Sequence, residues 1–290
     1  MNTVFHNRDI SDRDRLNALY EGQLFSYSVR PSSESLIQYA KDLAETHFEP
    51  HHPMTAQNHL SVEEYVAILG KLKPIFINSD TSKRLLQSML IEFGCDPDKT
   101  YFDVPRLRTS THSNFLTSGL AYAFHAHRDT WFSAPMCQIN WWLPVYEIES
   151  NNCMALHPAY FDRAIQNGSA DFDYDDWVNV GRKNAAQHVN KDTRKQPHAE
   201  EELQLEPSLR IVTEPGGVML FSANHLHSSV PNTSETTRIS IDFRTIHIDD
   251  VAENRGATNV DCRCTGTTLG DFMRVSDLAH LDESLIKQYC

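Results

Sequence analysis

Residues 217–227 read Gly217-Val218-Met219-Leu220-Phe221-Ser222-Ala223-Asn224-His225-Leu226-His227. An apolar run that ends at Phe221 is therefore followed, within a few positions, by two histidines. Short apolar runs bounded by turn residues are typical of β-strands. We expect a strand here that leads directly to a candidate metal-ligating histidine.

Runs of the same kind recur from Tyr101 onward and predict a β core. The expected strands are residues 101–104, 120–127, 136–145, 208–213, 217–221 and 238–248. No segment of 20–50 residues repeats along the chain, so a solenoid or a propeller is not indicated.

The first hundred residues are instead typical of helices. Ser61 and Glu64 form a capping box ahead of an apolar run. Gly94 follows the run from Ser82 to Phe93 and is expected to end that helix. Because these helices show no candidate chemistry, we interpret residues 1–100 as a helical flank to the β core.

The 290 residues are interpreted as a single domain, mainly β with flanking helices. In this interpretation the core is made of residues 101–158 and 207–248. Residues 159–206 form an insertion within it, and residues 249–290 form a C-terminal segment.

The insertion is polar, but it contains Phe172, Tyr174 and Trp177. Solvated linkers seldom carry such aromatic side chains together. We expect the insertion to form a lid over the β core. A merely solvated excursion is the alternative.

Composition and charge narrow the class of partner. The chain has 39 acidic and 26 basic residues, and its net charge of −13 would repel a phosphate backbone. The N-terminus shows no signal-peptide pattern, and no apolar run approaches the ~20 residues that span a bilayer. We expect a cytoplasmic protein that binds neither nucleic acid nor a membrane.

The six cysteines contain no CxxC pair and are too sparse for a disulfide scaffold, so reduced thiols are expected. Cys262 and Cys264 form a CxC motif that could bind a metal ion. Without a second pair of cysteines, this signal is weak.

The candidate chemistry begins with an HxD triplet, which occurs three times in the chain. A two-histidine-one-carboxylate iron site needs two ligands at positions i and i+2 and a distant third histidine. His127-Arg128-Asp129 is followed by histidines about a hundred residues later, whereas the triplets at 247–249 and 280–282 lack this partner. His125 lies beside His127, but only His127 completes the triplet.

Arg238 stands eleven positions after His227. The planar guanidinium of arginine can hold a carboxylate through two parallel hydrogen bonds. A buried arginine on the next strand is what a dicarboxylic cosubstrate would require.

In these features the sequence resembles the phytanoyl-CoA dioxygenase-like branch of the Fe(II)/2-oxoglutarate-dependent oxygenases. The resemblance covers about residues 101–248. Its motifs are His127-x-Asp129, Trp142-Leu143-Pro144-Val145 followed by Asn152-Cys153-Met154-Ala155-Leu156-His157-Pro158, Pro215-Gly216-Gly217 leading to Phe221, and His227-x4-Asn232-x-Ser234-x3-Arg238. One departure is His157-Pro158-Ala159, where a turn similar to Pro-Gly-Ser-His is common in the family.

The resemblance implies a double-stranded β-helix, also called a jelly roll or cupin-like core. It also implies that His127, Asp129 and His227 bind Fe(II). The spacing to Arg238 selects His227 over its neighbour His225.

The same resemblance assigns the cosubstrate site. Arg238 would form a salt bridge with 2-oxoglutarate, and Ser240 fits an Arg-x-Ser pattern in which the hydroxyl holds the same carboxylate. Gln138 is expected to be a further cosubstrate contact.

The implied reaction consumes O2 and 2-oxoglutarate and releases succinate and CO2. It hydroxylates a C–H bond, or removes an alkyl group where that carbon bears nitrogen or oxygen. Halogenation is disfavoured, because related halogenases replace the carboxylate of Asp129 by Gly or Ala. The expected substrate is a small-molecule metabolite, such as a small acid or an intermediate of secondary metabolism.

Residues on or next to the triad strands are expected to line the substrate pocket. The candidates are Phe124, Trp131, Trp142, Arg106 and Arg108, with Asn140 nearby and Arg244 as a second anion contact. Core packing is the alternative for the two tryptophans, and a solvated face is the alternative for Arg106 and Arg108.

Two other functions remain open from the sequence. One is a catalytically silent, cupin-like metal- or ligand-binding protein, although such a protein has no need of Arg238. The other is a zinc hydrolase with the same ligands, although no activated general base is evident beside them.

Overall fold

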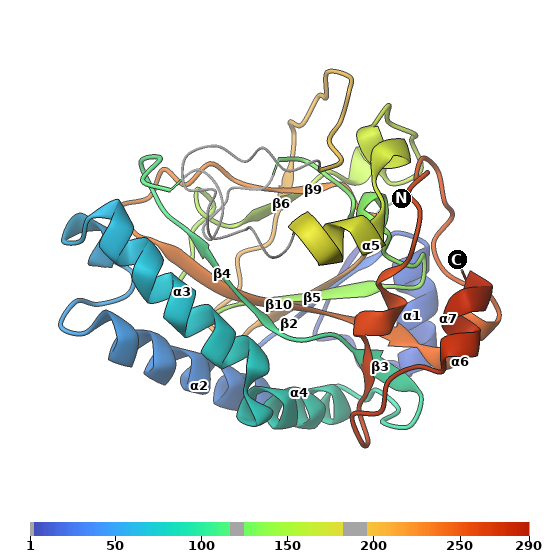
Figure 1. Ribbon diagram of the computed structural model, residues 1–290, viewed down its shortest axis with the longest axis horizontal. Helices are drawn as coiled ribbons and strands as arrows, with labels where there is room; N and C mark the ends of the chain where they lie inside the picture. The colour runs from blue at the N-terminus through green and yellow to red at the C-terminus, as the bar shows by residue number, and fades with distance from the viewer. Residues whose placement is uncertain (1–2, 117–124, 182–195, 290) are drawn as a thin grey trace.

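Two facing β-sheets, with helices packed on one of them, make up the fold (Figure 1). The computed structural model describes residues 3–116, 125–181 and 196–289. The major sheet has the order β1 (Val4–His6), β2 (Leu24–Tyr27), β8 (Val218–Ser222), β5 (Ile139–Pro144), β10 (Arg238–His247), β3 (Thr100–Phe102) and β11 (Met273–Arg274), and β4 (Arg106–Ser110) also pairs with β10. The minor sheet has the order β7 (Leu209–Arg210), β6 (Met154–Leu156) and β9 (His227–Ser229).

The major sheet lies in the middle of the molecule, with the minor sheet on one side of it (Figure 1). Among the described strands, only the pair β1–β2 is parallel. Two antiparallel sheets that face each other are the arrangement of a jelly roll. The predicted fold class, a double-stranded β-helix core with flanking helices, is confirmed.

The alternation of side chains along β10 gives the major sheet one apolar face and one charged face. Ile239, Ile241 and Phe243 are fully buried in the cluster that the helices share with the sheet. The side chains of the even-numbered residues from Arg238 to Arg244 point toward the opposite face, since successive side chains of a strand alternate between its faces. One face therefore builds the core, and the other carries charged groups toward the minor sheet.

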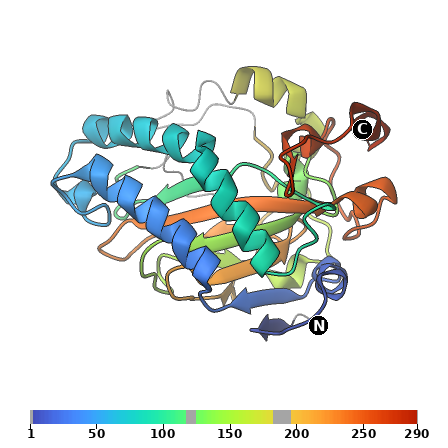
Figure 2. The same cartoon turned by 90° about the horizontal axis from the view of Figure 1, so that it is seen from below.

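The helices α1 (Asp12–Tyr20), α2 (Pro31–Phe48), α3 (Val62–Asn78) and α4 (Asp80–Glu92) belong to the N-terminal flank. Figure 2 shows α2, α3 and α4 across the outer face of the major sheet. The predicted capping box is present at the start of α3, where Ser61 and Glu64 exchange hydrogen bonds. Gly94 follows α4 with φ of +81°, a conformation that favours glycine, and so ends the helix as predicted.

The flank and the C-terminal segment also supply strands, which the sequence did not predict. β1 and β2 extend the major sheet beyond β8, and β11 extends it beyond β3. Strands of two to four residues carry too short a pattern to be recognised by alternation. The strand predicted over 120–127 falls mostly on 117–124, outside the described residues.

Short helices complete the chain: α5 (Tyr174–Asp176) in the insertion, and α6 (Ile248–Ala252) and α7 (Glu283–Tyr289) in the C-terminal segment. Within the described ranges, no helix is long and apolar enough to cross a membrane.

Candidate active site

Three candidate metal ligands meet between the two sheets. His127 and His227 lie opposite each other, and each backbone N–H donates to the other's carbonyl at 3.0 Å. Asp129 begins the short helix η3 (Asp129–Phe132), and its N–H donates to the carbonyl of Ala223. Backbone pairing therefore brings together two segments that lie far apart in the sequence.

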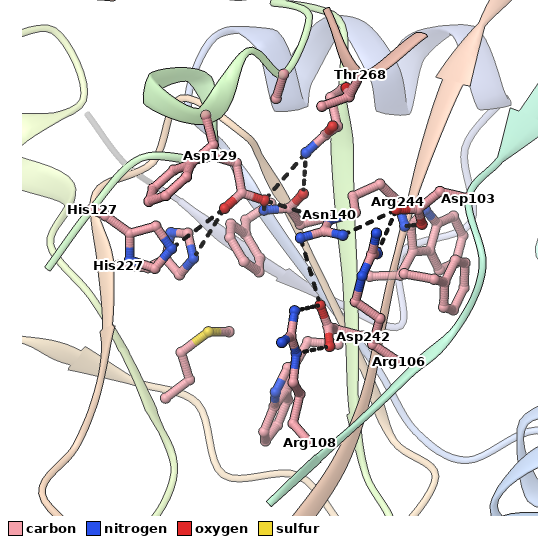
Figure 3. Close-up of a pocket in the computed structure, with 18 of the residues that line it drawn as sticks. Asp103, Arg106, Arg108, His127, Asp129, Asn140, His227, Asp242, Arg244 and Thr268 are labelled. Atoms are coloured by element: carbon pink, nitrogen blue, oxygen red, sulfur yellow. Dashed lines mark hydrogen bonds and ion pairs between the residues drawn. The ribbon is translucent and has the colours of Figure 1, made fainter. Parts of the chain in front are cut away.

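The distances between the side chains suit a single metal ion. Nε2 of His127 lies 3.5 Å from Oδ1 of Asp129, and Nε2 of His227 lies 3.7 Å from the same oxygen. The three ligand atoms all lie within 4.8 Å of one another (Figure 3). Donors bind a divalent ion at about 2.0–2.2 Å, so all three can reach one ion between them.

Backbone carbonyls set the ring orientation of both histidines. Nδ1 of His127 lies 2.8 Å from the carbonyl of His125, and Nδ1 of His227 lies 3.0 Å from the carbonyl of His225. Because a carbonyl only accepts, Nδ1 of each ring is the donor in this contact, and Nε2 of each ring faces Asp129. Burial, helped by the nearby His127, lowers the pKa of His227 to about 4, so the ring is neutral near pH 7.

The other histidine of the second doublet points elsewhere. The ring of His225 is fully buried and packs against Phe161, with ring centroids 4.6 Å apart. Its Nε2 lies 3.2 Å from the carbonyl of Gly22. His225 therefore supports the site through its carbonyl, and His227 supplies the imidazole.

The second oxygen of Asp129 is held by neighbours on the major sheet. Asn140 and Gln138 donate to Oδ2 at 2.9 and 3.2 Å, and Nε of Arg244 lies 3.6 Å away (Figure 3). Burial alone would raise the pKa of Asp129, but His127 and Arg244 hold it well below its ordinary value. The carboxylate is therefore ionised, and its rotation leaves Oδ1 facing the histidines.

A cavity of about 340 Å³ opens over these ligands. Its walls come from the inner faces of β4, β5 and β10, from β9, and from the insertion. A volume of this size falls within the usual range of small-molecule sites.

Arg238 lies in the cavity wall and is only 5% exposed. Its Nη1 donates to the carbonyls of Asn152 and Cys153, at 3.2 and 3.1 Å, while Nε has no hydrogen-bond partner. Burial lowers the pKa of Arg238 to about 10, which leaves it charged near pH 7. Within the described chain, no carboxylate forms an ion pair with it.

The two other predicted cosubstrate residues differ in placement. Ser240 is fully buried two positions after Arg238, and its hydroxyl has no hydrogen-bond partner. Gln138 lines the cavity and also donates to Asp129 and Asn140, so it supports a candidate metal ligand, and its contact with a cosubstrate stays a prediction.

Arg106 and Arg108 line the cavity, but both are ion-paired. Nε and Nη2 of Arg108 bind the two oxygens of Asp242 at 2.7 and 3.2 Å, and Arg106 binds Asp103 at 2.5 Å (Figure 3). Arg244 joins these pairs, at 3.0 Å from Asp103 and 3.9 Å from Asp242. The arginines thus form a network with aspartates that the sequence analysis did not identify.

The predicted aromatic residues are distributed unevenly. Trp142 lines the cavity, and the guanidinium of Arg238 lies 5.8 Å from its ring centre. Trp131 is fully buried in a separate cluster and donates its indole N–H to Asp261 at 2.8 Å, so it packs in the core rather than at the cavity wall. Phe124 lies outside the described residues.

Residues of the insertion contribute to the cavity wall. Phe172, Tyr174 and Trp177 all line it. Phe172 packs edge-on against Phe132, whose ring packs in the same way against His127. The insertion therefore contacts the candidate site; whether it moves as a lid stays a prediction.

A fully buried arginine that the sequence analysis passed over lies in the middle of the HxD triplet. Arg128 donates to the carboxylate of Asp261 at 3.1 Å and to the carbonyls of Tyr160 and Arg163 at 2.5 and 2.8 Å, and it also bonds the carbonyl of Asn224. It joins the triplet to three distant segments. No local pattern could have indicated these partners.

Comparisons with known proteins place the chain among distant structural neighbours. No family model matches the sequence, and no curated protein matches it. One similar solved structure is the non-heme monooxygenase ThoJ, with a TM-score of 0.42, 10% identity, and coverage of 74% of this chain and 70% of ThoJ.

Two further neighbours come from nogalamycin biosynthesis. The epimerase SnoN, solved with Fe3+, alpha ketoglutarate and nogalamycin RO, has a TM-score of 0.42 and 11% identity, covering 81% of this chain and 85% of SnoN. The alpha ketoglutarate-dependent carbocyclase SnoK has a TM-score of 0.39 and 10% identity, covering 82% of this chain and 85% of SnoK. At this level of similarity, these neighbours assign no function to the chain.

Proposed function

We propose that the chain is a non-haem Fe(II)- and 2-oxoglutarate-dependent oxygenase that oxidises a small molecule. One observation carries the proposal: a His-Asp-His group and the buried, carboxylate-free Arg238 line the same cavity. The first supplies metal donors. The second supplies a cation for the far end of a dicarboxylic ligand.

The donor set fits Fe(II). Two neutral imidazole nitrogens and one carboxylate oxygen, on one side of an ion, are the ligands of non-haem Fe(II) oxygenases. His127, Asp129 and His227 would hold the ion and leave its remaining positions open. Their arrangement supports this, because both Nε2 atoms face Oδ1 of Asp129 and Asp129 is ionised.

The surroundings of Arg238 fit a carboxylate of 2-oxoglutarate. The carbonyls of Asn152 and Cys153 orient its guanidinium without neutralising its charge. A buried charge without a counter-ion is costly, and a bound carboxylate would remove that cost. The hydroxyl of Ser240, which also has no partner, would donate to the same group.

Iron with 2-oxoglutarate, when bound, would use O2 to oxidise a C–H bond and release succinate and CO2. The residues of the chain position the metal ligands and limit water in the cavity. Asn140 and Gln138 fix the rotation of Asp129, and the two carbonyls fix the histidine rings. Phe172 and Trp177 narrow access to the cavity and so limit water near the reacting groups.

The charges of the cavity argue against a charged group as the main substrate contact. Apart from Arg238, each arginine of the wall has an aspartate partner. We therefore propose a substrate held by aromatic packing and neutral hydrogen bonds. The small acid favoured by the sequence would have to break one of these ion pairs.

Succinate formation provides the test. We expect purified protein with Fe(II), 2-oxoglutarate and O2 to release succinate slowly without any added substrate. His127→Ala, Asp129→Ala and His227→Ala should abolish this release while circular dichroism stays unchanged, because the ligands line a preformed cavity. The matched control is His125→Ala, which leaves the carbonyl contact to His127 in place and should retain activity.

The same preparation separates the alternatives. A silent binding protein would take up the metal and release no succinate. A zinc hydrolase would give no charge-transfer absorption when 2-oxoglutarate is added to the Fe(II) protein without O2. Either result in the wild-type protein would contradict the proposed function.

A further inference from the structure

Cys262 and Cys264 bring two thiols together outside the candidate active site. Their Sγ atoms lie 3.1 Å apart, closer than an ordinary contact between two sulfurs. Both side chains are partly exposed, whereas the other described cysteines, Cys95, Cys137 and Cys153, are buried. This pair is thus the part of the described chain where two thiols can react with each other.

Both thiols also approach a single backbone carbonyl behind the metal site. Cys262 lies 2.9 Å and Cys264 lies 3.4 Å from the oxygen of Thr130. Thr130 is fully buried in η3 and directly follows the candidate ligand Asp129. The cysteine pair therefore supports the segment that carries the carboxylate.

A second cavity gives small molecules a route to the pair. It measures about 460 Å³ and is lined by Cys262, its neighbours in 259–263, the residues 164–166 and Glu201. It shares no lining residue with the cavity over the metal ligands. A thiol reagent could therefore approach the pair beside Cys262 without entering the candidate active site, and Cys264, which does not line this cavity, is itself partly exposed.

From this arrangement we propose that Cys262 and Cys264 form a reversible disulfide, and that this bond weakens the hold of the chain on its metal ion. The disulfide itself does not depend on the proposed function. Only its consequence for metal binding rests on the His-Asp-His site.

The chemistry is a two-step exchange with a low-molecular-weight disulfide such as oxidised glutathione. The hydrogen bond from Cys262 lowers the pKa of Cys264 to about 6, so Cys264 provides the thiolate. It attacks one sulfur of the reagent and releases the first thiol. Cys262 then loses its proton, attacks Sγ of Cys264 and releases the second thiol, so that two cysteine thiols and one disulfide give one disulfide and two thiols.

The spacing of the two residues allows this bond but strains it. Two residues of extended chain separate Cα atoms by about 7 Å at most. Disulfides usually join Cα atoms about 4.4–6.8 Å apart, so closure requires the segment to bend slightly. Strained disulfides are easily reduced, which makes the bond reversible.

With Cys264 as the thiolate, the single proton of Cys262 is shared between Sγ of Cys264 and the oxygen of Thr130, and forming the disulfide removes this donor. A buried carbonyl that loses its donor is destabilised, so η3 and Asp129 should be held less firmly. Losing one hydrogen bond of this kind predicts a metal affinity that is about two- to tenfold lower.

The bond itself is tested by redox titration. The Cys290→Ser variant is equilibrated with reduced and oxidised glutathione at several ratios, quenched in acid, alkylated after denaturation and mapped by mass spectrometry. We expect the peptide that contains Cys262 and Cys264 to lose two hydrogens in one step, while Cys95, Cys137 and Cys153 remain alkylated. A pair that stays reduced at every ratio, or that carries glutathione without forming the internal bond, would overturn the proposal.

The consequence is tested with Co(II) as the metal probe. Calorimetry without O2 should show two- to tenfold weaker binding to the oxidised protein than to the reduced protein. Cys262→Ser and Cys264→Ser should each make the affinity insensitive to glutathione. Equal affinities of the two forms would refute the coupling to the metal site. Since neither readout needs turnover, a failed succinate assay would count against the proposed function alone.

Discussion

At the scale of single residues, Arg238 shows how a buried charge can indicate a ligand. Its guanidinium has two carbonyl partners and no acidic one within the described chain, and Nε makes no hydrogen bond. Desolvation of such a group is unfavourable unless an anion compensates it. The spacing from His227 located this residue in the sequence, and the structure places it in the wall of the cavity.

Replacing Arg238 by Gln should therefore weaken 2-oxoglutarate binding selectively. Loss of one partner of a buried, hydrogen-bonded ion pair costs about 2–5 kcal/mol, which is well over tenfold in affinity. The 2-oxoglutarate concentration for half-maximal succinate release should rise accordingly, while Co(II) binding stays unchanged. Arg210→Gln, at an exposed position of β7, is the control. An unchanged 2-oxoglutarate requirement would remove Arg238 from the site.

Arg128 illustrates a different contribution, in which a charge organises the backbone. It is fully buried, and Asp261 is its acidic partner. Its remaining N–H groups bond carbonyls of the insertion and of the turn that precedes His227. The position of both segments relative to the HxD triplet therefore depends on one side chain.

Arg128→Lys should lower both stability and metal affinity. A single ammonium group cannot reach all of these acceptors, so buried carbonyls lose their donors and the pair with Asp261 is weakened. We expect a loss of about 3–5 kcal/mol in the free energy of unfolding, measured with urea. Arg163→Lys, an exposed neighbour of the same cluster, should change it by less than about 1 kcal/mol. Similar stabilities of the two variants would show that the contacts of Arg128 are dispensable.

At the scale of elements, alternation along β10 accounts for what the sequence could predict. The strand was expected over 238–248 and occurs at Arg238–His247. Its inward positions include Arg238 and Arg244, which sequence spacing alone places on one face. The same alternation would have included Asp242, the partner of Arg108, had acidic residues been considered on that face.

The remaining parts of the site depend on contacts between distant segments. Asp103 forms an ion pair with Arg244, 141 positions away in the sequence, and Trp131 donates a hydrogen bond to Asp261, 130 positions away. Such pairs arise from the way that strands and loops meet in space, and no short motif encodes them. For this reason the sequence indicated the candidate metal ligands, two of which share the HxD motif, and placed Gln138 at the cavity without its bond to Asp129, whereas Trp131 packs in the core.

The insertion should affect how often the release of succinate is accompanied by oxidation of the substrate. Trp177 lies against Phe172, with ring centroids 6.0 Å apart, at the wall of the cavity. Removing its ring should let water reach the site and raise the fraction of succinate released without substrate oxidation. We expect Trp177→Ala to raise this fraction at least twofold once a substrate is known. Asp171→Ala, an exposed change in the same insertion, should leave it unchanged; equal fractions in both variants would mean that the aromatic wall excludes no water.

At the scale of the whole molecule, the burial of histidines links stability to pH. Desolvation lowers the pKa of His225 to about 3 and that of His227 to about 4, against about 6.5 in the unfolded chain. Below pH 6.5 the unfolded state therefore binds protons that the folded state does not bind, so the free energy of unfolding falls as pH falls. The lowered pKa of Asp129 acts in the same direction, but only below the ordinary carboxyl range, near pH 4.

Between pH 7 and pH 5, the metal-free protein should thus lose stability mainly through its buried histidines. A group that stays neutral in the fold but has an unfolded pKa near 6.5 contributes a loss of about 2 kcal/mol at pH 5. Urea unfolding at the two pH values measures the total. His225→Gln keeps a donor for the carbonyl of Gly22 but cannot take up a proton, so it should reduce the difference between pH 7 and pH 5 by about that amount. His198→Gln, at an exposed position, should leave the difference in the free energy of unfolding between pH 7 and pH 5 as it is in the wild type. If the two variants show the same difference, burial of His225 does not govern the acid sensitivity of the fold.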